Sequence, residues 1–149
     1  MPTHAETKIL PHKPEEMFDL VADVGRYPEF LPWCIGARVR TRTETLMVAD
    51  LIIGFKGLRE NFTSNVMLNR EAMTIEVSYQ DGPFKFLKNN WKFNNFDAGQ
   101  CSLDFYVEFE FKSRILQKMI EMLFSEAVRR MVTAFEQRAA QVYGSAAIS

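Results

Sequence analysis

The sequence predicts an α+β fold in which a curved antiparallel sheet of about six or seven strands surrounds one long C-terminal helix. Between residues 35 and 111, apolar and polar residues alternate in successive segments, which is typical of strands with one buried face. From Ser113 to Tyr143 the apolar spacing changes to three or four residues, which is typical of a helix. Strands in series followed by a helix on one side favour an α+β fold, and we expect a single domain over residues 1–149.

The N-terminal third is expected to contain a strand, two short helices and a rigid connector. Residues 3–10 are predicted to form the first strand, which a proline ends. Pro14, with two glutamates directly after it, predicts the start of a helix that stops near Asp23. Residues 27–34 then place two prolines among four large apolar side chains. This pattern predicts a rigid apolar connector that closes one end of the fold.

The strands that follow are expected to have one apolar face each. The first of them should carry Ile35, Ala37, Val39 and Thr41 on one face, and Gly36, Arg38, Arg40 and Arg42 on the other. The later strands should each place one of the following sets on a single face: Met47, Ala49, Leu51, Ile53 and Phe55; Leu58, Glu60, Phe62, Ser64, Val66 and Leu68; Met73, Ile75, Val77 and Tyr79; Phe84, Phe86, Trp91 and Phe93, with an interruption at residues 88–90; and Cys101, Leu103, Phe105, Val107, Phe109 and Phe111. A sheet this apolar on one side must curl around the helix to cover that face.

The long helix is expected to start after Ser113, a suitable N-cap, and to stop at Gly144. At 1.5 Å per residue it would span roughly 45 Å. Its first third is apolar on nearly all sides, through Ile115, Leu116, Met119, Ile120, Met122, Leu123 and Phe124. Two explanations stay open: the 27–34 connector covers this segment, or the segment is displayed to a membrane or a partner and marks where a ligand enters.

Composition limits the classes of function. A formal net charge of −1 argues against a protein that is dedicated as a whole to nucleic acid. Cys34 and Cys101 match no metal-ligand spacing, so no metal site is predicted. We find neither a signal peptide nor an apolar run of the roughly 20 residues that a membrane span needs. We therefore expect a cytoplasmic protein with reduced thiols, in peripheral contact at most with the inner membrane.

Four stretches of the chain resemble the coenzyme Q-binding START-domain family. They are Tyr27-Pro28-Glu29-Phe30-Leu31-Pro32-Trp33-Cys34, Phe55-Lys56-Gly57-Leu58-Arg59-Glu60, Asp81-Gly82-Pro83-Phe84-Lys85 and Phe109-Glu110-Phe111-Lys112-Ser113. The resemblance implies the helix-grip fold of the START-like superfamily. It also implies a cavity that binds ubiquinone, so that the protein serves respiration as a lipid chaperone with no cofactor of its own. Mitochondrial members carry a targeting extension, which this sequence lacks, so it resembles a bacterial member.

The predicted cavity wall consists of large apolar side chains from the connector, the sheet and the helix. The candidates are Phe30, Leu31, Trp33, Phe55, Phe62, Trp91, Phe105, Phe124, Val128, Met131 and Phe135. Glu60 is a further candidate, because its position places a carboxylate on an apolar face. It would either orient a quinone head group at the polar end of the cavity, or form a structural ion pair with Arg59 or Arg70. A shift of register at Gly57 is the third explanation.

Two other functions are open at this stage. The same superfamily includes a bacterial ribosome association toxin, and Arg38, Arg40 and Arg42 would suit contact with ribosomal RNA phosphates. It also includes polyketide cyclases, which would need a general acid and a general base in the cavity. Only Glu60 and Tyr79 have the predicted facing for that role. His4 and His12 are expected to be surface or structural residues, so no catalytic residue is predicted.

Overall fold

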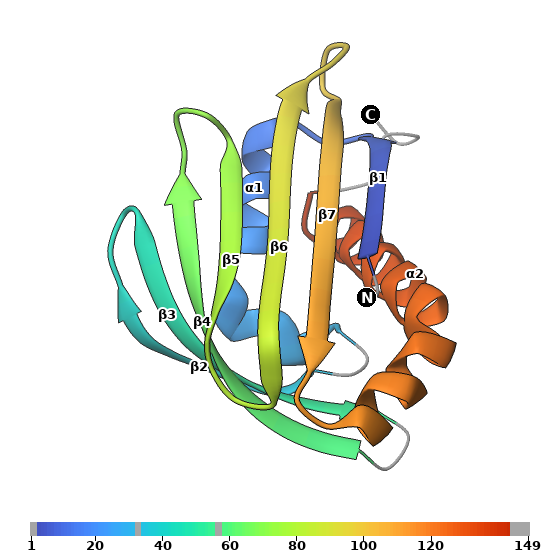
Figure 1. The fold of residues 1–149 in the computed structure, drawn as a ribbon. Helices are drawn as coiled ribbons and strands as arrows, with labels where there is room; N and C mark the ends of the chain where they lie inside the picture. The colour runs from blue at the N-terminus through green and yellow to red at the C-terminus, as the bar shows by residue number, and fades with distance from the viewer. Residues whose placement is uncertain (1–2, 32–33, 56–57, 144–149) are drawn as a thin grey trace.

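Seven antiparallel strands form one continuous sheet in the order β1-β7-β6-β5-β4-β3-β2 (Figure 1). The computed structural model describes residues 3–31, 34–55 and 58–143. The strands are β1 (Thr3–Leu10), β2 (Cys34–Arg42), β3 (Leu46–Phe55), β4 (Leu58–Asn69), β5 (Thr74–Asp81), β6 (Phe84–Asn95) and β7 (Cys101–Phe111). The helices are α1 (Pro14–Ala22), the 3-10 helix η1 (Val24–Glu29) and α2 (Arg114–Tyr143). The prediction of a curved sheet with a long C-terminal helix is confirmed.

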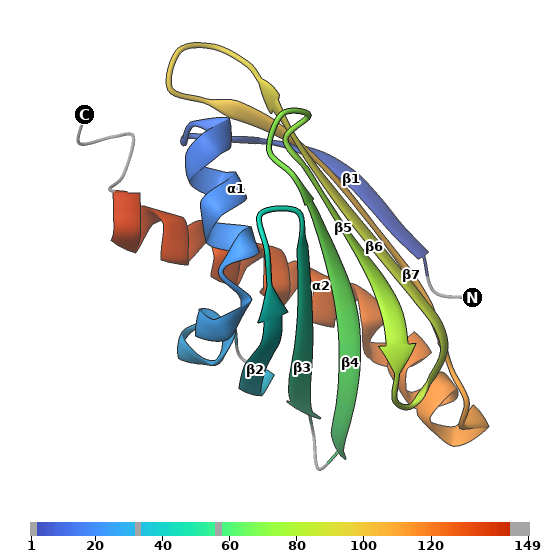
Figure 2. The ribbon, with the colours of Figure 1, turned by 90° about the vertical axis from the view of Figure 1, so that its left-hand side faces the viewer.

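Helix α2 crosses the concave side of the sheet, as the view in Figure 2 shows. Its start has the predicted cap: the hydroxyl oxygen of Ser113 accepts a hydrogen bond from the backbone N–H of Leu116 at 3.3 Å. Gln117 adds a second link, since its side-chain oxygen accepts from the backbone N–H of Phe111 at 2.8 Å. These two bonds fix the direction in which the helix leaves β7. The predicted stop at Gly144 lies outside the described residues.

Helix α1 closes one end of the curved sheet. Pro14 is its first residue, and the side chain of Glu16 accepts a hydrogen bond from the backbone N–H of Lys13 at 3.0 Å. The helix buries its apolar side, and the ring of Phe18 meets that of Phe93 on β6 edge to face, with centroids 6.2 Å apart. The short helix η1 then leads into β2, and its start at Val24 agrees with the predicted break near Asp23.

Two β-bulges in β2 change the predicted division of its faces at both ends of the strand, whereas Ala37 and Val39 lie opposite Leu51 and Ala49 on the inner face, as predicted. The register shifts between Cys34 and Gly36, and again between Val39 and Thr41. Cross-strand partners share a face, so Arg38 lies with its partner Asp50, whereas Arg42 lies with Met47, which is fully buried in the interior. Because each bulge inserts one unpaired residue, Ile35 is exposed. The three arginines therefore do not form a ladder on one face.

Strand β6 runs without the interruption predicted at residues 88–90. Asn89 stays in the strand opposite Val107, and its side chain bonds within the sheet. The irregularity lies instead near Phe84 and Phe86, where the register shifts. Met73, predicted to open the preceding strand, lies in the turn before β5 with a positive φ of 56°.

The interior contains two apolar clusters. The larger one joins α1, the sheet and the second half of α2, while the smaller one centres on Phe84, Phe109 and Phe111. Leu116, Ile120 and Phe124 pack on the smaller cluster, so the first third of α2 uses one side for this contact. Among the described residues, no helix has the length and apolar character needed to cross a membrane.

Candidate functional site

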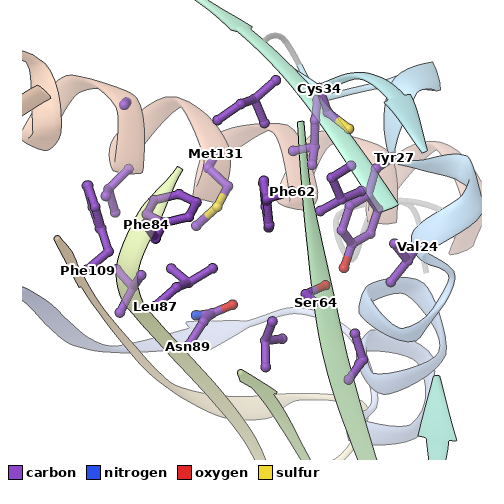
Figure 3. Close-up of a pocket in the computed structure, with 18 of the residues that line it drawn as sticks. Val24, Tyr27, Cys34, Phe62, Ser64, Phe84, Leu87, Asn89, Phe109 and Met131 are labelled. Atoms are coloured by element: carbon purple, nitrogen blue, oxygen red, sulfur yellow. The ribbon is translucent and has the colours of Figure 1, made fainter. Parts of the chain in front are cut away.

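An apolar cavity of about 220 Å³ lies between the concave face of the sheet, helix η1 and helix α2 (Figure 3). Protein interiors contain few voids larger than a water molecule, so a space of this size is a feature to be explained. Its wall is formed by Val24, Tyr27, Leu31, Cys34, Leu51, Ile53, Gly54, Phe62, Ser64, Val66, Ile75, Val77, Phe84, Leu87, Asn89, Trp91, Phe105, Val107, Phe109, Phe111, Ile120, Phe124, Ala127, Val128, Met131 and Phe135. Members of both apolar clusters therefore contribute to the wall.

Most of the predicted wall residues lie together around this cavity. They are Leu31, Phe62, Trp91, Phe105, Phe124, Val128, Met131 and Phe135. Phe30 does not line it; its ring packs against Tyr27 and Phe135, and the guanidinium of Arg138 lies over it at 5.2 Å. Trp33 and the side chain of Phe55 lie outside the described part of the chain. The periodicity of β4, β7 and α2 predicts six of these eight, while Leu31 comes from the connector and Trp91 from β6.

Glu60 is partly buried on β4 but does not belong to the cavity wall. Its cross-strand partner is Ile53, near the end of the β3–β4 pair. One of its two suggested arginine partners is engaged elsewhere, because Arg70 pairs with Asp19 of α1 at 2.8 Å. Since Ile53 lines the cavity and Glu60 does not, Glu60 lies beside the wall, and its role in orienting a ligand stays a prediction.

The polar groups of the wall come from residues that the sequence did not mark as site residues. Tyr27 donates its hydroxyl hydrogen to the backbone carbonyl of Val21, and Cys34 bonds to the carbonyl of Gly36 at 3.5 Å. Burial is the main cause that raises the pKa of the Tyr27 hydroxyl and that of the Cys34 thiol. Both groups are therefore neutral at pH 7, and the wall contains no Asp, Glu, His, Lys or Arg among the described residues.

Asn89 brings an amide to the wall from the middle of β6. Its nitrogen donates to the backbone carbonyl of Tyr106 at 2.9 Å, and its oxygen accepts from the indole N–H of Trp91 at 2.7 Å. These two bonds hold the amide in one orientation and leave it one free N–H. No local pattern predicts this role, because an Asn-Asn pair after a lysine is typical of a turn.

Ser64 is the fourth polar residue of the wall, and its hydroxyl has no hydrogen-bond partner in the described protein. Its side chain is 1% exposed. Figure 3 places Tyr27 and Val24 at one side of the cavity and Phe84 and Phe109 at the other, with Ser64 and Asn89 between them. The alternation of β4 did predict that Ser64 shares a face with Phe62 and Val66, but not that its hydroxyl would be unpaired.

The first third of α2 is exposed on the side that faces away from the cavity. Ile115 is 76% exposed and Met122 is 86% exposed. The described residues of the 27–34 connector do not cover them, because Tyr27 and Phe30 pack on Phe135, which follows Ile115 by 20 residues and Met122 by 13. Of the two explanations, coverage by the connector is therefore wrong. Lys112, Arg114 and Lys118 are exposed beside this apolar surface.

The arginines of β2 are at the exposed edge of the sheet. Arg40 pairs with Asp50 of β3 at 2.5 Å, and Thr63 of β4 donates a hydrogen bond to the same carboxylate. The hydrogen bond from Thr63, together with Arg40, lowers the pKa of Asp50. Arg40 is thus partly neutralised, and Arg38 and Arg42 lie on opposite faces of the strand.

Comparison with known proteins shows which family and which relatives the chain is similar to. The model of the family described as polyketide cyclase/dehydrase and lipid transport matches residues 10–136. Over 139 residues the chain is 40% identical to the ribosome association toxin RatA of Rickettsia prowazekii, covering 91% of this chain and 94% of the relative. Over 144 residues it is 34% identical to the mitochondrial coenzyme Q-binding protein COQ10 homolog B of Xenopus laevis, covering 95% of this chain and 59% of the relative.

A solved structure supports the fold independently. A START superfamily protein from Mycobacterium smegmatis superposes with a TM-score of 0.80 at 19% identity, covering 94% of this chain and 98% of that one. At this level of identity the likeness shows the fold alone. The predicted resemblance to the START-like superfamily, and with it the helix-grip fold, is confirmed.

Proposed function

As the chain belongs to the polyketide cyclase/dehydrase and lipid transport family, we propose that it binds an isoprenoid quinone such as ubiquinone in its cavity and acts as a lipid chaperone. The observation that carries this proposal is the cavity wall, which is apolar and uncharged. Ligand sites of this kind are mostly hydrophobic, with a small number of polar groups that orient the ligand. A relative whose name states coenzyme Q binding adds support.

The size of the cavity suits the ring of such a ligand better than its whole length. An apolar cavity of roughly 150 Å³ can stay dry and accept a single aromatic ring. The 220 Å³ available here accommodates a ring and the first part of a tail. The remainder of a long isoprenoid chain would have to leave the cavity.

The charge state of the wall supports binding over catalysis. A cyclase or dehydratase needs one group that donates a proton and one that accepts it at working pH. The described wall offers Tyr27 and Cys34, whose raised pKa values keep both protonated. Tyr79, one of the two predicted candidates, packs against Phe84 and does not line the cavity. A neutral ligand that is held without being transformed fits this wall best.

Affinity should rise with the length of a quinone tail and then level off. Each buried methylene contributes about 0.8 kcal/mol, or about fourfold in the dissociation constant, until the cavity is full. Isothermal titration calorimetry with ubiquinone analogues of increasing alkyl length would measure this, and mass spectrometry would identify lipid that copurifies. Protein that contains no lipid and takes up no short-chain quinone would contradict the proposed function.

Transient contact with a membrane is the partner interaction that this function requires. The exposed Ile115 and Met122 lie beside Lys112, Arg114 and Lys118. Apolar residues flanked by basic ones favour the surface of a membrane that contains anionic lipids. On the cavity side, the same third of α2 contributes Ile120 and Phe124 to the wall, so a tail that leaves there would meet this surface.

Association with a ribosomal subunit is the second candidate function, favoured by the 40% identity to a ribosome association toxin. The variant R38Q/R42Q is expected to cosediment less with ribosomal subunits and to show a salt dependence that is weaker by about 1.5 in log–log slope, since each phosphate contact contributes roughly 0.7. The control R26Q/R70Q removes the same charge from two exposed arginines elsewhere. Equal cosedimentation of both variants and the wild type would exclude this edge as the contact.

A further inference from the structure

Two buried hydroxyl groups in this protein have no hydrogen-bond partner among the described residues: those of Ser64 and Tyr79. The two residues are directly opposite each other on β4 and β5, so they share a face. Burying a hydroxyl without a partner is unfavourable, and native structures contain few such groups. Only Ser64 belongs to the cavity wall, which makes its unpaired hydroxyl a candidate ligand contact.

Each of the other polar residues of the wall forms at least one hydrogen bond within the protein. The Tyr27 hydroxyl donates to the carbonyl of Val21, and the Asn89 amide is held by Tyr106 and Trp91. Alternation along β4 separates the two neighbours: Thr63 turns outward to bond Asp50, while Ser64 points inward. Within the described wall, Ser64 has its full hydrogen-bonding capacity left for a ligand.

The surroundings of Ser64 define the chemistry of that ligand. The described wall has no cation that would balance a carboxylate or a phosphate, and burying an unpaired charge in an apolar site is costly. An oxygen that Ser64 contacts must therefore be neutral, as in a carbonyl or an ether. On the far side of the cavity from Tyr27, Phe84 and Phe109 offer only apolar surface, which suits hydrocarbon.

We propose that Ser64 orients the ligand by donating a hydrogen bond to a neutral carbonyl or ether oxygen on its ring, while the hydrocarbon tail extends toward Phe84 and Phe109. This inference rests on the proposed function and specifies how the same cavity selects its ligand. It makes Ser64 a determinant of specificity: oxygenated rings are favoured over plain hydrocarbons of the same shape, and fatty acids are rejected. The free N–H of Asn89 is positioned to contribute a second contact from β6.

The test compares two variants with two probes. Ser64→Ala removes the hydroxyl that lines the cavity, and Tyr79→Phe removes the unpaired hydroxyl that does not. The probes are a short-chain ubiquinone and an alkylbenzene with a tail of the same length, both titrated by calorimetry. Ser64→Ala is expected to weaken quinone binding roughly three- to tenfold and to leave alkylbenzene binding unchanged, since one neutral hydrogen bond is lost. Tyr79→Phe should bind both probes as the wild type does.

Thermal unfolding without ligand distinguishes this role from a structural one. Ser64→Ala removes an unsatisfied buried group, so its melting temperature should equal or exceed that of the wild type even as quinone affinity falls. Quinone affinity that is unchanged in Ser64→Ala, or reduced equally in Tyr79→Phe, would overturn the role of Ser64 and leave the proposed function intact. A wild-type protein that binds neither probe would overturn both.

Discussion

Replacing Met131 with glutamate is expected to abolish quinone uptake, with a loss of at least a hundredfold in affinity. Met131 lies on the cavity side of α2 and its side chain reaches into the space beside Phe62 (Figure 3). The described wall contains no cation that could pair with a carboxylate at this position. The carboxylate must therefore either retain bound water in the cavity or become protonated. In both cases the apolar contact with the ligand is lost. Calorimetry with a short-chain ubiquinone measures the effect.

The pH dependence of that variant provides a second measurement. Burial raises the pKa of a carboxyl group, because it disfavours the charged form. The neutral form therefore predominates as the pH falls below the raised pKa, and part of the lost affinity should return in that range. Met131→Gln, which is polar but uncharged, should lose less affinity and show no such recovery.

Thr133→Glu is the matched control for charge on the same helix. Thr133 is exposed and does not line the cavity, so this variant should bind quinone as the wild type does. Circular dichroism would establish that both glutamate variants keep the fold. A folded Met131→Glu variant with wild-type affinity would show that the quinone does not occupy this cavity.

The residues that build the cavity were largely predictable because its wall follows simple periodicities. Phe62 lies on a strand of period two, while Phe124, Val128, Met131 and Phe135 follow one side of a helix. Both patterns arise because one side of each element is buried, so the spacing of apolar residues predicts which side chains face the interior. The alternation of β4 likewise predicts that Ser64 lies on the inner face, but not that its hydroxyl lacks a partner there.

The structure differs from the sequence prediction where an extra residue in a strand, or a single side-chain hydrogen bond, changes the local conformation. The two bulges in β2 place Ile35, Thr41 and Arg42 differently from the predicted alternation but leave Ala37 and Val39 on the predicted face, and no pattern in residues 34–42 marks the bulges in advance. Asn89 stays in its strand because the Tyr106 carbonyl and the Trp91 indole bond its side chain, and these partners are distant in sequence or depend on the strand itself. Hydrogen bonds formed by tertiary contact are not encoded in local spacing.

The same limitation applies to Glu60 and to the start of α2. The alternation of β4 predicts an inward-facing position for Glu60, and its cross-strand partner Ile53 does line the cavity, but Glu60 itself is not part of the wall. The apolar start of α2 was recognised, yet its coverage depended on where the 27–34 connector packs, and that connector contacts Phe135 instead. Sequence periodicity predicts which side of an element is apolar, whereas the extent of a cavity depends on how the elements cross.

Replacing Phe18 with alanine is expected to lower the free energy of unfolding by about 3–5 kcal/mol, the largest effect on stability from a single side chain in α1. Phe18 is 0% exposed, its ring meets that of Phe93 edge to face, and the guanidinium of Arg70 lies over it at 4.6 Å. Small domains are stable by about 5–15 kcal/mol, so this loss is a large part of the total. Urea unfolding with and without the substitution measures it, provided that the slope stays the same.

Because Phe18 does not line the cavity, its replacement separates stability from binding. The folded fraction of Phe18→Ala should bind a short-chain ubiquinone with wild-type affinity, in contrast to Met131→Glu, which should keep its fold and lose the ligand. Phe96→Ala is the control, since Phe96 is 53% exposed beyond the end of β6 and its loss should change stability by less than about 0.5 kcal/mol. A loss of less than about 1 kcal/mol in Phe18→Ala would mean that α1 does not hold the end of the sheet as its burial indicates.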